Sequence, residues 1–369
     1  MNITAALKRR SRLENLKVFQ RNAEKTQVLT PNYKNPEAVK NRLTHSYEVK
    51  TSGELIAAFI AADFINVDYQ HAIGNVCLMH DIGHPPFGHD GSRLLDRRMR
   101  ELGLDEGFDD NSNNFVVIEK NAGHGAMSDY EKASLIKYPN RLYKKDKERL
   151  LIALDRSILQ DVEYFEKNKI HINELPKRTL ACQIMDEADR NSYVCSDLSD
   201  CYCIGIGNIN EIEKLLDEKH FLSSSINEVL GGIYYSVKNK DITLIKDVFN
   251  RFKNMLNSNY YIGDNISLKN KNLELVELRE SLYKIEKRIF IHSEYVRKQI
   301  DDGLKMFNDY IDYVLENEHY PSKTYAKMIK NSTGNEKYRF IRDMIAETTD
   351  KYVAKWWENE FNKQGRLDI

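Results

Sequence analysis

Apolar residues recur along most of this chain at the three- and four-residue intervals of an amphipathic α-helix, and this periodicity constrains the fold more than any other feature. Helix-breaking residues are scarce, with 17 glycines and 7 prolines among 369 residues. No segment shows the alternation of a β-strand over any length, and TQVLT at 26–30 is a short candidate at most. We therefore predict an all-α fold.

Two segments show this periodicity clearly. In 45–64, where Thr44 or Ser46 could cap the helix start, the apolar face comprises Val49, Leu55, Ile56, Phe59 and Ile60. In 178–205 the apolar face comprises Ala181, Ile184, Met185 and Ala188. Both segments are long enough to form the centre of a helical core.

The second half of the chain is less informative. Two or three more amphipathic helices are predicted from about Ser293 onward, and the segment 267–289 is typical of a helix whose charges face water. The expected organisation is one unit, 1–369, with a helical core at about 40–205 and a C-terminal helical region at about 206–369.

Charge and cysteine content exclude several classes of protein. The 55 basic and 56 acidic residues leave a net charge of -1, which gives no global field for nucleic acid or a membrane surface. No apolar run approaches the roughly 20 residues that span a bilayer. The five cysteines are an odd number, which fits a reducing cytoplasm. Cys201 and Cys203 could suggest zinc, but no second pair accompanies them, so we interpret them as buried apolar residues.

The stretch LMHDIGHPPFGHDG at 78–91 concentrates the polar chemistry of the chain. His80 and Asp81 follow an apolar helical run, His45 lies near another helix start, and Asp189 begins a stripe that continues at four-residue intervals through Tyr193 and Asp197. Two imidazoles and two carboxylates suit Mn, Fe, Co, Ni or Mg and leave coordination positions open. Spacing alone leaves open a second interpretation, a polar turn with hydrogen-bonded core histidines.

Six ordered motifs resemble those of the deoxyguanosinetriphosphate triphosphohydrolase family, within the HD-domain phosphohydrolases. They are KTQV at 25–28, NRLTHSYEV at 41–49, HDIGHPPFGHDG at 80–91, IKYP at 136–139, ADRNSYVCSDLSD at 188–200 and RDMIAETTDKY at 342–352. The resemblance implies an all-helical HD-domain core. It also implies hydrolysis of a deoxynucleoside triphosphate to deoxynucleoside and triphosphate, with dGTP as the expected substrate. A divalent metal cofactor is implied as well. Mn²⁺ or Mg²⁺ is the expected ion, and Fe, Co and Ni are the alternatives.

The resemblance also assigns expected roles to individual residues. The metal ligands would be His45, His80, Asp81 and Asp189, with Asp186 as a rival for the last place. The catalytic residues would be His89, with His84 and Asp90 as further candidates. The phosphate contacts would be Arg42, Lys137, Tyr138 and Arg190. Gln27, Tyr193 and Asp197 would contact the deoxyribose. Asn111 would line the substrate-binding site.

Some of these residues have ordinary structural alternatives. Arg42 could pair with Glu48, Tyr193 could be a core tyrosine, and Gln27 could cap a turn.

The chain departs from the family pattern at Ser92, where an acidic residue usually follows the catalytic histidine by three positions. Asp90, Asp109 and Asp110 are candidates to replace this carboxylate. The outcomes left open are full activity with a rearranged proton relay, slow activity without an activator, and binding without turnover.

Two other functions remain as alternatives. One is an HD phosphohydrolase acting on another nucleotide, and the other is a nucleotide- or single-stranded-DNA-binding protein with a weakened active site. The resemblance further implies a homo-oligomer, tetramer or hexamer, with a nucleotide or single-stranded DNA as a possible effector.

Overall fold

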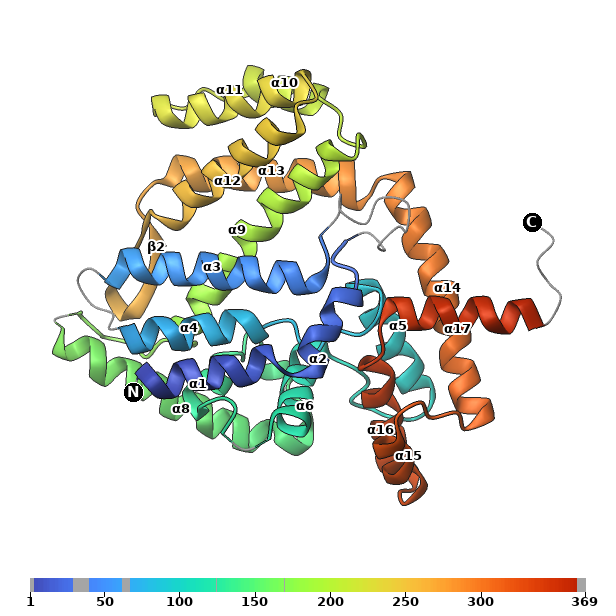
Figure 1. Ribbon diagram of the computed structural model, residues 1–369. Helices are drawn as coiled ribbons and strands as arrows, with labels where there is room; N and C mark the ends of the chain where they lie inside the picture. The colour runs from blue at the N-terminus through green and yellow to red at the C-terminus, as the bar shows by residue number, and fades with distance from the viewer. Residues whose placement is uncertain (1–2, 29–39, 62–66, 124, 169, 364–369) are drawn as a thin grey trace.

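The computed structural model describes residues 3–28, 40–61, 67–123, 125–168 and 170–363, and these are 74% helical, which confirms the all-α prediction (Figure 1). The α-helices of the first half are α1 (Ile3–Glu14), α2 (Lys17–Gln20), α3 (Arg42–Ala61), α4 (Val67–Met79), α5 (Gly88–Glu101), α6 (Asp110–Ala122), α7 (Asp129–Ala133), α8 (Lys144–Lys167) and α9 (Leu180–Cys203). Two 3-10 turns accompany them, η1 (Arg21–Glu24) and η2 (Pro139–Arg141).

The second half is also helical. Its α-helices are α10 (Asn210–Glu218), α11 (Ser224–Lys238), α12 (Ile242–Asn257), α13 (Leu273–Glu286), α14 (Glu294–Asn317), α15 (Lys323–Lys330), α16 (Gly334–Ala346) and α17 (Asp350–Lys363). Between them lie β1 (Tyr260–Gly263), the 3-10 turn η3 (Asp264–Ile266), β2 (Ser267–Asn270) and the π-helical turn η4 (Lys287–Ile291).

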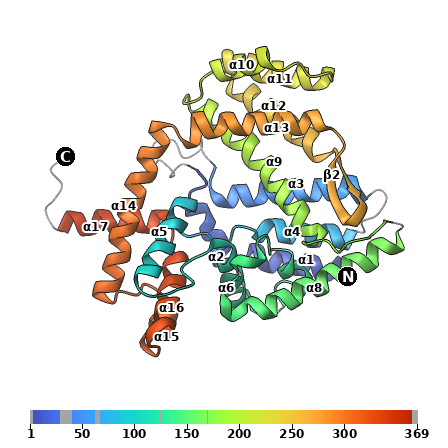
Figure 2. The same ribbon diagram turned by 180° about the vertical axis from the view of Figure 1, so that it is seen from behind.

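Helix α9 connects two hydrophobic clusters and is the central element of the fold. Its predicted apolar face, Ala181, Ile184, Met185 and Ala188, is fully buried against the cluster that includes α3 and α4. Further along, Val194 and Leu198 pack into a second cluster with α11, α12 and α13. Figure 2 shows α9 running from the α3–α4 layer toward α13. One helix therefore presents its polar stripe at the junction of both clusters.

Helix α3 begins three residues earlier than predicted, and its cap is a different residue. The side chain of Asn41 accepts a hydrogen bond from the backbone N–H of Thr44, whereas the hydroxyls of Thr44 and Ser46 donate to backbone carbonyls. The predicted apolar face is also only partly buried, because Phe59 remains 50% exposed. Asn41 also forms an isolated β-bridge with Thr26, within the described part of the candidate strand 26–30.

The prediction for 267–289 was wrong in two respects. Residues 267–270 form β2, which pairs antiparallel with β1 in a short hairpin that sequence analysis missed. Helix α13 is not a solvated helix, because its leucines belong to the second hydrophobic cluster; they are Leu275, Leu278 and Leu282. Its buried Arg279 donates to Glu187 and Asn191 of α9, both at 2.7 Å.

The C-terminal segment forms four helices, α14 to α17, where two or three were predicted. Phe307, Tyr310 and Met344 pack with Leu95 and Met99 of α5 in a third hydrophobic cluster. Across the described ranges, no helix is long and apolar enough to cross a membrane. All five cysteines are free, and only Cys203 is not fully buried.

Candidate active site

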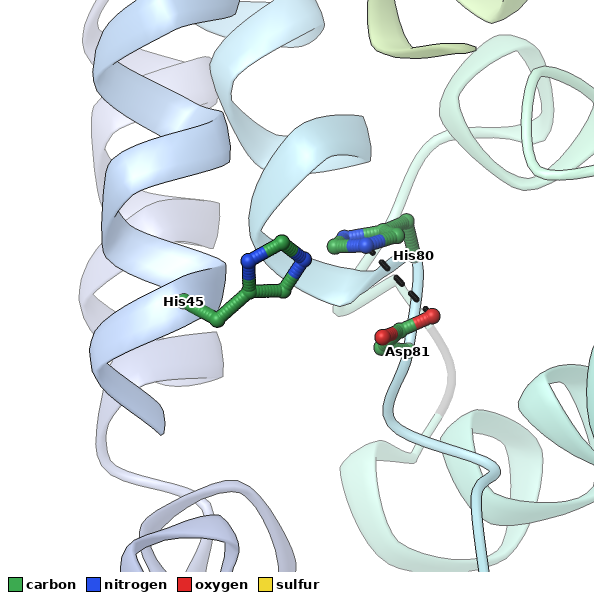
Figure 3. Close-up of side chains that lie close together, drawn as sticks. All are labelled: His45, His80 and Asp81. Atoms are coloured by element: carbon green, nitrogen blue, oxygen red, sulfur yellow. Dashed lines mark ion pairs between the residues drawn. The ribbon is translucent and has the colours of Figure 1, made fainter. Parts of the chain in front are cut away.

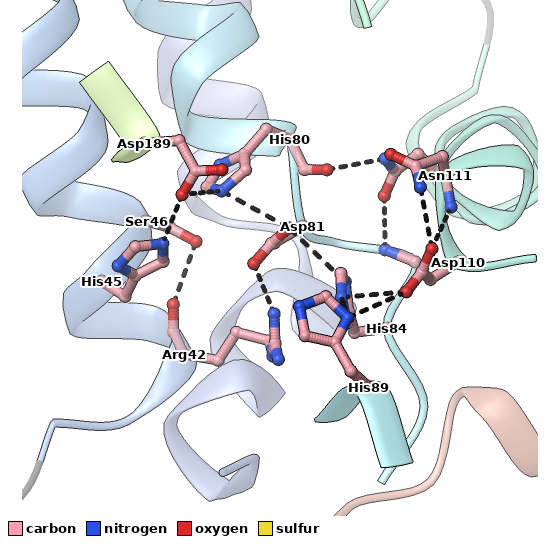
Figure 4. A network of polar contacts seen from close by, with 12 residues as sticks. Arg42, His45, Ser46, His80, Asp81, His84, His89, Asp110, Asn111 and Asp189 are labelled. Carbon is pink, nitrogen blue, oxygen red and sulfur yellow. Dashed lines mark hydrogen bonds and ion pairs between the residues drawn. The ribbon is translucent and has the colours of Figure 1, made fainter. Parts of the chain in front are cut away.

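The structure brings the four predicted metal ligands together from α3, the turn after α4, and α9. Figure 3 shows three of them, His45, His80 and Asp81, and Figure 4 adds Asp189. His45 lies on the first turn of α3, His80 and Asp81 directly follow α4, and Asp189 lies on α9. The Asp189 Oδ1 atom is 3.1 Å from His45 Nε2 and 3.5 Å from His80 Nε2, and Asp81 Oδ1 is 3.4 Å from His80 Nε2. We name these four residues the metal cluster.

The two ring nitrogens of His80 differ in their contacts. Its Nδ1 atom is 2.8 Å from the carbonyl oxygen of Cys77, to which it can donate its proton. Its Nε2 atom is buried and has no hydrogen-bond partner among the described residues. A buried imidazole lone pair between two carboxylates fits a divalent cation.

Asp189 is better placed than its rival Asp186 to complete this cluster. The Asp186 carboxylate is 2.8 Å from Lys137 Nζ and 3.0 Å from Arg178, and among the described residues it forms no ion pair with a histidine. Burial alone would raise the pKa of Asp189, but His80 and Lys137 hold it well below its usual range. Asp189 is therefore a carboxylate at neutral pH.

A buried arginine and a partly buried lysine adjoin the metal cluster. Arg42 pairs with Asp81, and not with Glu48, which contacts Lys40 and Lys253 instead. Lys137 Nζ is 3.4 Å from Asp189 Oδ2. Both cations therefore lie directly beside the metal cluster, where an anionic substrate would need them.

A second cluster lies beside the first and contains His84, His89 and Asp110 (Figure 4). The Asp110 Oδ2 atom is 3.1 Å from His84 Nε2 and 3.5 Å from His89 Nδ1. Burial alone would raise the pKa of Asp110, but His84 and His89 hold it well below its usual range. Burial and the charge of Arg42 lower the pKa of His84. We name this group the histidine cluster.

Asp110 supplies a carboxylate close to the position that Ser92 leaves without one. Asp109 cannot do so, because its side chain caps α6 by accepting from the Ser112 N–H at 2.8 Å. Asp90 does not join the histidine cluster either, since its carboxylate pairs with Arg93 and with Arg297. Asn111 donates to Asp110 Oδ1 from its side-chain amide at 2.8 Å.

The turn that connects the two clusters is fixed by residues that sequence analysis did not single out for this role. Asn113 donates to the carbonyl of Gly83 at 2.8 Å, and Asn114 donates to the carbonyl of His80 at 2.6 Å. The buried Lys25 donates to the carbonyl of His84. Only the KTQV motif pointed toward Lys25, and nothing in the sequence indicated what it contacts.

The remaining predicted contacts lie around this centre. Tyr193 packs its ring 5.6 Å from that of Tyr283, and Arg190 faces Glu187 at 3.7 Å. The backbone carbonyl of Gln27 lies next to Gly88, 3.8 Å from the position that a Cβ atom would take at that glycine. Tyr138 is 43% exposed, with the Arg141 guanidinium 4.7 Å from its ring centre.

The far end of the α9 stripe holds two buried acids. Burial and Asp200 raise the pKa of Asp197, and burial and Asp197 raise the pKa of Glu286. Both Glu286 oxygens lack a hydrogen-bond partner among the described residues, and sequence analysis missed this residue.

Three curated relatives align with nearly the whole chain. The deoxyguanosinetriphosphate triphosphohydrolase-like protein 2 of Deinococcus radiodurans is 26% identical and covers 95% of this chain and 90% of its own length. The deoxyguanosinetriphosphate triphosphohydrolase-like protein of Rickettsia typhi is 26% identical, covering 96% and 92%. The protein of that name from Aliivibrio salmonicida is 24% identical, covering 95% and 92%.

The other comparisons add little. No family model matches the chain. A hypothetical protein from Aquifex aeolicus aligns at 17% identity over 97% of this chain and 70% of its own, with a TM-score of 0.45.

Proposed function

Because this chain belongs to the family of deoxyguanosinetriphosphate triphosphohydrolase-like proteins, we propose that it hydrolyses a deoxynucleoside triphosphate to deoxynucleoside and inorganic triphosphate. The proposed preferred substrate is dGTP. The observation that carries this proposal is the contact between the two clusters. His84 Nδ1 is 3.5 Å from Asp81 Oδ1, so a group that transfers protons borders the metal cluster. Hydrolysis at the α-phosphorus needs both functions at one place.

The metal cluster would hold a divalent cation, and we propose Mn²⁺ or Mg²⁺. When bound, the cation neutralises phosphoryl charge and lowers the pKa of a water. The buried, unpartnered Nε2 of His80 and the two ionised carboxylates support this assignment. Two histidines and two aspartates leave coordination positions free for water and a phosphate oxygen.

Arg42 and Lys137 would bind the phosphates. Each contacts a carboxylate of the metal cluster, so each lies close to the place where a phosphate oxygen bound to the cation would be. Tyr138, Arg190 and Asn111 are proposed as further contacts on the strength of the family resemblance. Fixed cations around the triphosphate stabilise the charge that develops during phosphoryl transfer.

The histidine cluster would move the protons. The Asp110 carboxylate orients both imidazoles and stabilises whichever one becomes protonated. His89 is 74% exposed at its side chain, so it can meet a substrate, whereas His84 is buried. We propose that His89 delivers a proton to the departing 5′-oxygen and that His84 and Asp110 maintain its orientation.

The α9 stripe would bind the deoxyribose. Asp189 and Asp197 are separated by eight residues, or about 12 Å along a helix axis, which is the scale of a nucleotide from its α-phosphate to its base. Tyr193 lies between them, and its packing against Tyr283 fixes the ring. We propose that Tyr193 excludes a 2′-hydroxyl and that Asp197 and Gln27 bind the 3′-hydroxyl.

A product analysis tests this function. The purified protein is incubated with Mn²⁺ or Mg²⁺ and each of the four deoxynucleoside triphosphates, and the products are separated by anion exchange. We expect deoxynucleoside and tripolyphosphate in equal amounts, with the highest kcat/KM for dGTP, and no product from His80→Asn. Pyrophosphate or orthophosphate as the only inorganic product would overturn the proposal in favour of another phosphohydrolase. Binding without any product would favour a binding protein with a weakened site.

The family resemblance also supports a homo-oligomer, tetramer or hexamer, with nucleotide or single-stranded DNA as an effector. A cytoplasmic location is proposed from the five free cysteines. Light scattering of the protein with and without dGTP tests the assembly, and a monomer under both conditions would contradict it.

A further inference from the structure

The histidine cluster has the donor atoms and the spacing of a second metal site. Its three donors are His84 Nε2, His89 Nδ1 and Asp110 Oδ2, which converge in Figure 4. The two nitrogens lie 3.4 Å apart, and the carboxylate oxygen is 3.1 Å from the first and 3.5 Å from the second. Among the described residues, the metal cluster is the only other place where three such donors lie this close together.

These separations fit zinc in particular. A tetrahedral ion with ligand bonds of about 2.0–2.1 Å holds its ligand atoms about 3.3–3.4 Å apart. The distances in the histidine cluster, from 3.1 to 3.5 Å, span this value. Two imidazoles and one carboxylate are also the ligand set of open zinc sites, in which water takes the fourth position. The three side chains therefore need to move little to bind Zn²⁺.

Neighbouring groups orient the two buried donors. Asn111 donates to the other carboxylate oxygen of Asp110, Oδ1, from its backbone N–H at 2.9 Å and from its side-chain amide at 2.8 Å. His84 Nδ1 faces Asp81 Oδ1 at 3.5 Å, so a proton on Nδ1 points toward a carboxylate and leaves the Nε2 lone pair to the histidine cluster. Zinc-binding histidines commonly direct their second nitrogen toward a carboxylate in this way.

The third donor is open to solvent. His84 and Asp110 are buried, whereas the side chain of His89 is 74% exposed. A cavity of 560 Å³ lies beside the cluster, and His89 and Asp110 line it. This cavity supplies a route for an ion and room for a fourth, non-protein ligand. Two fixed donors and one accessible donor are suited to an ion that binds and leaves.

We propose that the histidine cluster binds one Zn²⁺ ion through His84, His89 and Asp110, in addition to the ion of the metal cluster. Zn²⁺ binds nitrogen and oxygen ligands more tightly than Mn²⁺ or Mg²⁺, so it occupies this site in the presence of either. The ion takes the lone pairs that would otherwise accept protons, and it therefore inhibits turnover. This consequence rests on the proposed function, whereas the binding itself does not.

Zinc stoichiometry tests the site. The metal-free full chain is incubated with excess Zn²⁺, separated by gel filtration and analysed for zinc per chain. We expect two ions in the wild type and one in His89→Ala, which removes an exposed side chain and leaves the packing of the core intact. Asp90→Asn is the matched control and should bind two, because Asp90 pairs with Arg93 and Arg297. Fewer than two ions in the wild type, two in His89→Ala, or equal losses in both variants would overturn the proposal.

A second pair of variants assigns the ion to its site. His80→Asn disrupts the metal cluster and should retain one zinc ion, whereas His80→Asn/His89→Ala should retain none. Circular dichroism confirms that each variant remains helical before its zinc is counted. If the double variant keeps the ion that His80→Asn binds, this ion lies outside the histidine cluster and the proposal is wrong.

Kinetics test the consequence for turnover. With dGTP and saturating Mn²⁺, we expect micromolar Zn²⁺ to lower kcat of the wild type about tenfold or more, and a chelator that removes the zinc to restore it. An unchanged kcat with two zinc ions bound would overturn the inhibitory role. The stoichiometry needs no turnover, so an inactive wild type that binds its second zinc ion through His89 would contradict only the proposed function.

Discussion

At the scale of single residues, we propose that Asp110 takes the place of the acid that the family pattern has at position 92. It comes from α6, a different helix from the one that carries His89, and contacts both histidines of the histidine cluster. The carboxylate is thus supplied by a neighbouring helix and not by the turn that follows His89. An active enzyme is therefore compatible with a serine at position 92.

Asp110→Asn tests this assignment. The amide keeps the shape of the side chain but removes the charge that supports a protonated imidazole, so we expect kcat to fall by about 100-fold or more with KM changed only a few-fold. The matched control is Asp90→Asn, because Asp90 pairs with Arg93 and Arg297 and should leave kcat within a few-fold. Equal losses in both variants would show that Asp110 has no special role.

Asp189 and Asp186 allow an equally direct comparison. Both carboxylates contact Lys137, but only Asp189 contacts the histidines of the metal cluster. We expect Asp189→Asn to lose bound metal after dialysis, whereas Asp186→Asn retains it at wild-type stoichiometry. Elemental analysis of the dialysed proteins gives the answer, and retention of metal by Asp189→Asn would remove it from the ligand set.

At the scale of elements, the sequence predicted the helices whose apolar periodicity is undisturbed. Helix α9 is the best example, since its four predicted apolar residues are all buried. Helix α13 was misjudged because charged residues hide the spacing of Leu275, Leu278 and Leu282. The β1–β2 hairpin was missed because strands of four residues are too short to show alternation.

Some residues of the candidate site could be predicted from the sequence, and others could not. The motifs contain all four residues of the metal cluster. His45, His80 and Asp81 lie at or next to helix ends, and Asp189 lies on the polar stripe of α9, so each had a recognisable place in the sequence pattern. The choice among Asp90, Asp109 and Asp110 could not be made from sequence, since it depends on where α6 begins. Asp109 caps that helix, and the next residue therefore turns toward the histidines.

The contacts of Asp161 join four helices and give a prediction about stability. Its carboxylate accepts from the hydroxyls of Tyr69 (α4) and Tyr130 (α7) and from the Leu180 N–H that begins α9. Burial raises the pKa of Asp161 to about 6, whereas 3.8 is the ordinary value. The folded state therefore holds the proton more tightly, and its contribution to stability is present below pH 4 and lost as the pH rises through 6.

Chemical denaturation of the wild type and Asp161→Asn at several pH values checks this sign. We expect the free energy of unfolding of the wild type, relative to the variant, to fall by up to roughly 3 kcal/mol between pH 4 and pH 7. Asp155→Asn, an exposed position on the same helix α8, should follow the wild type throughout. A pH-independent difference for Asp161→Asn would contradict a pKa raised by burial.

At the scale of the whole molecule, segments near both ends of the chain contact the turn that carries the candidate catalytic histidines. Lys25 donates to the carbonyls of His84 and Ala346, which joins the KTQV motif to the histidine turn and to the end of α16. Asp350, at the start of α17, accepts from the backbone N–H groups of Thr26 and Phe87 at 2.8 and 3.0 Å. The KTQV and RDMIAETTDKY motifs therefore contact the turn at His84 and Phe87 without belonging to either cluster.

Asp350→Ala should reveal this arrangement. It leaves the buried N–H groups of Thr26 and Phe87 without an acceptor, and we expect the free energy of unfolding to fall by about 3 kcal/mol. Because Phe87 directly precedes the helix that carries His89, kcat should also fall, about tenfold or more, in the fraction that remains folded. Lys351→Ala removes an exposed pair with Glu24 and should change both quantities little. An Asp350→Ala protein that is destabilised but keeps wild-type kcat would show that the motif serves folding alone.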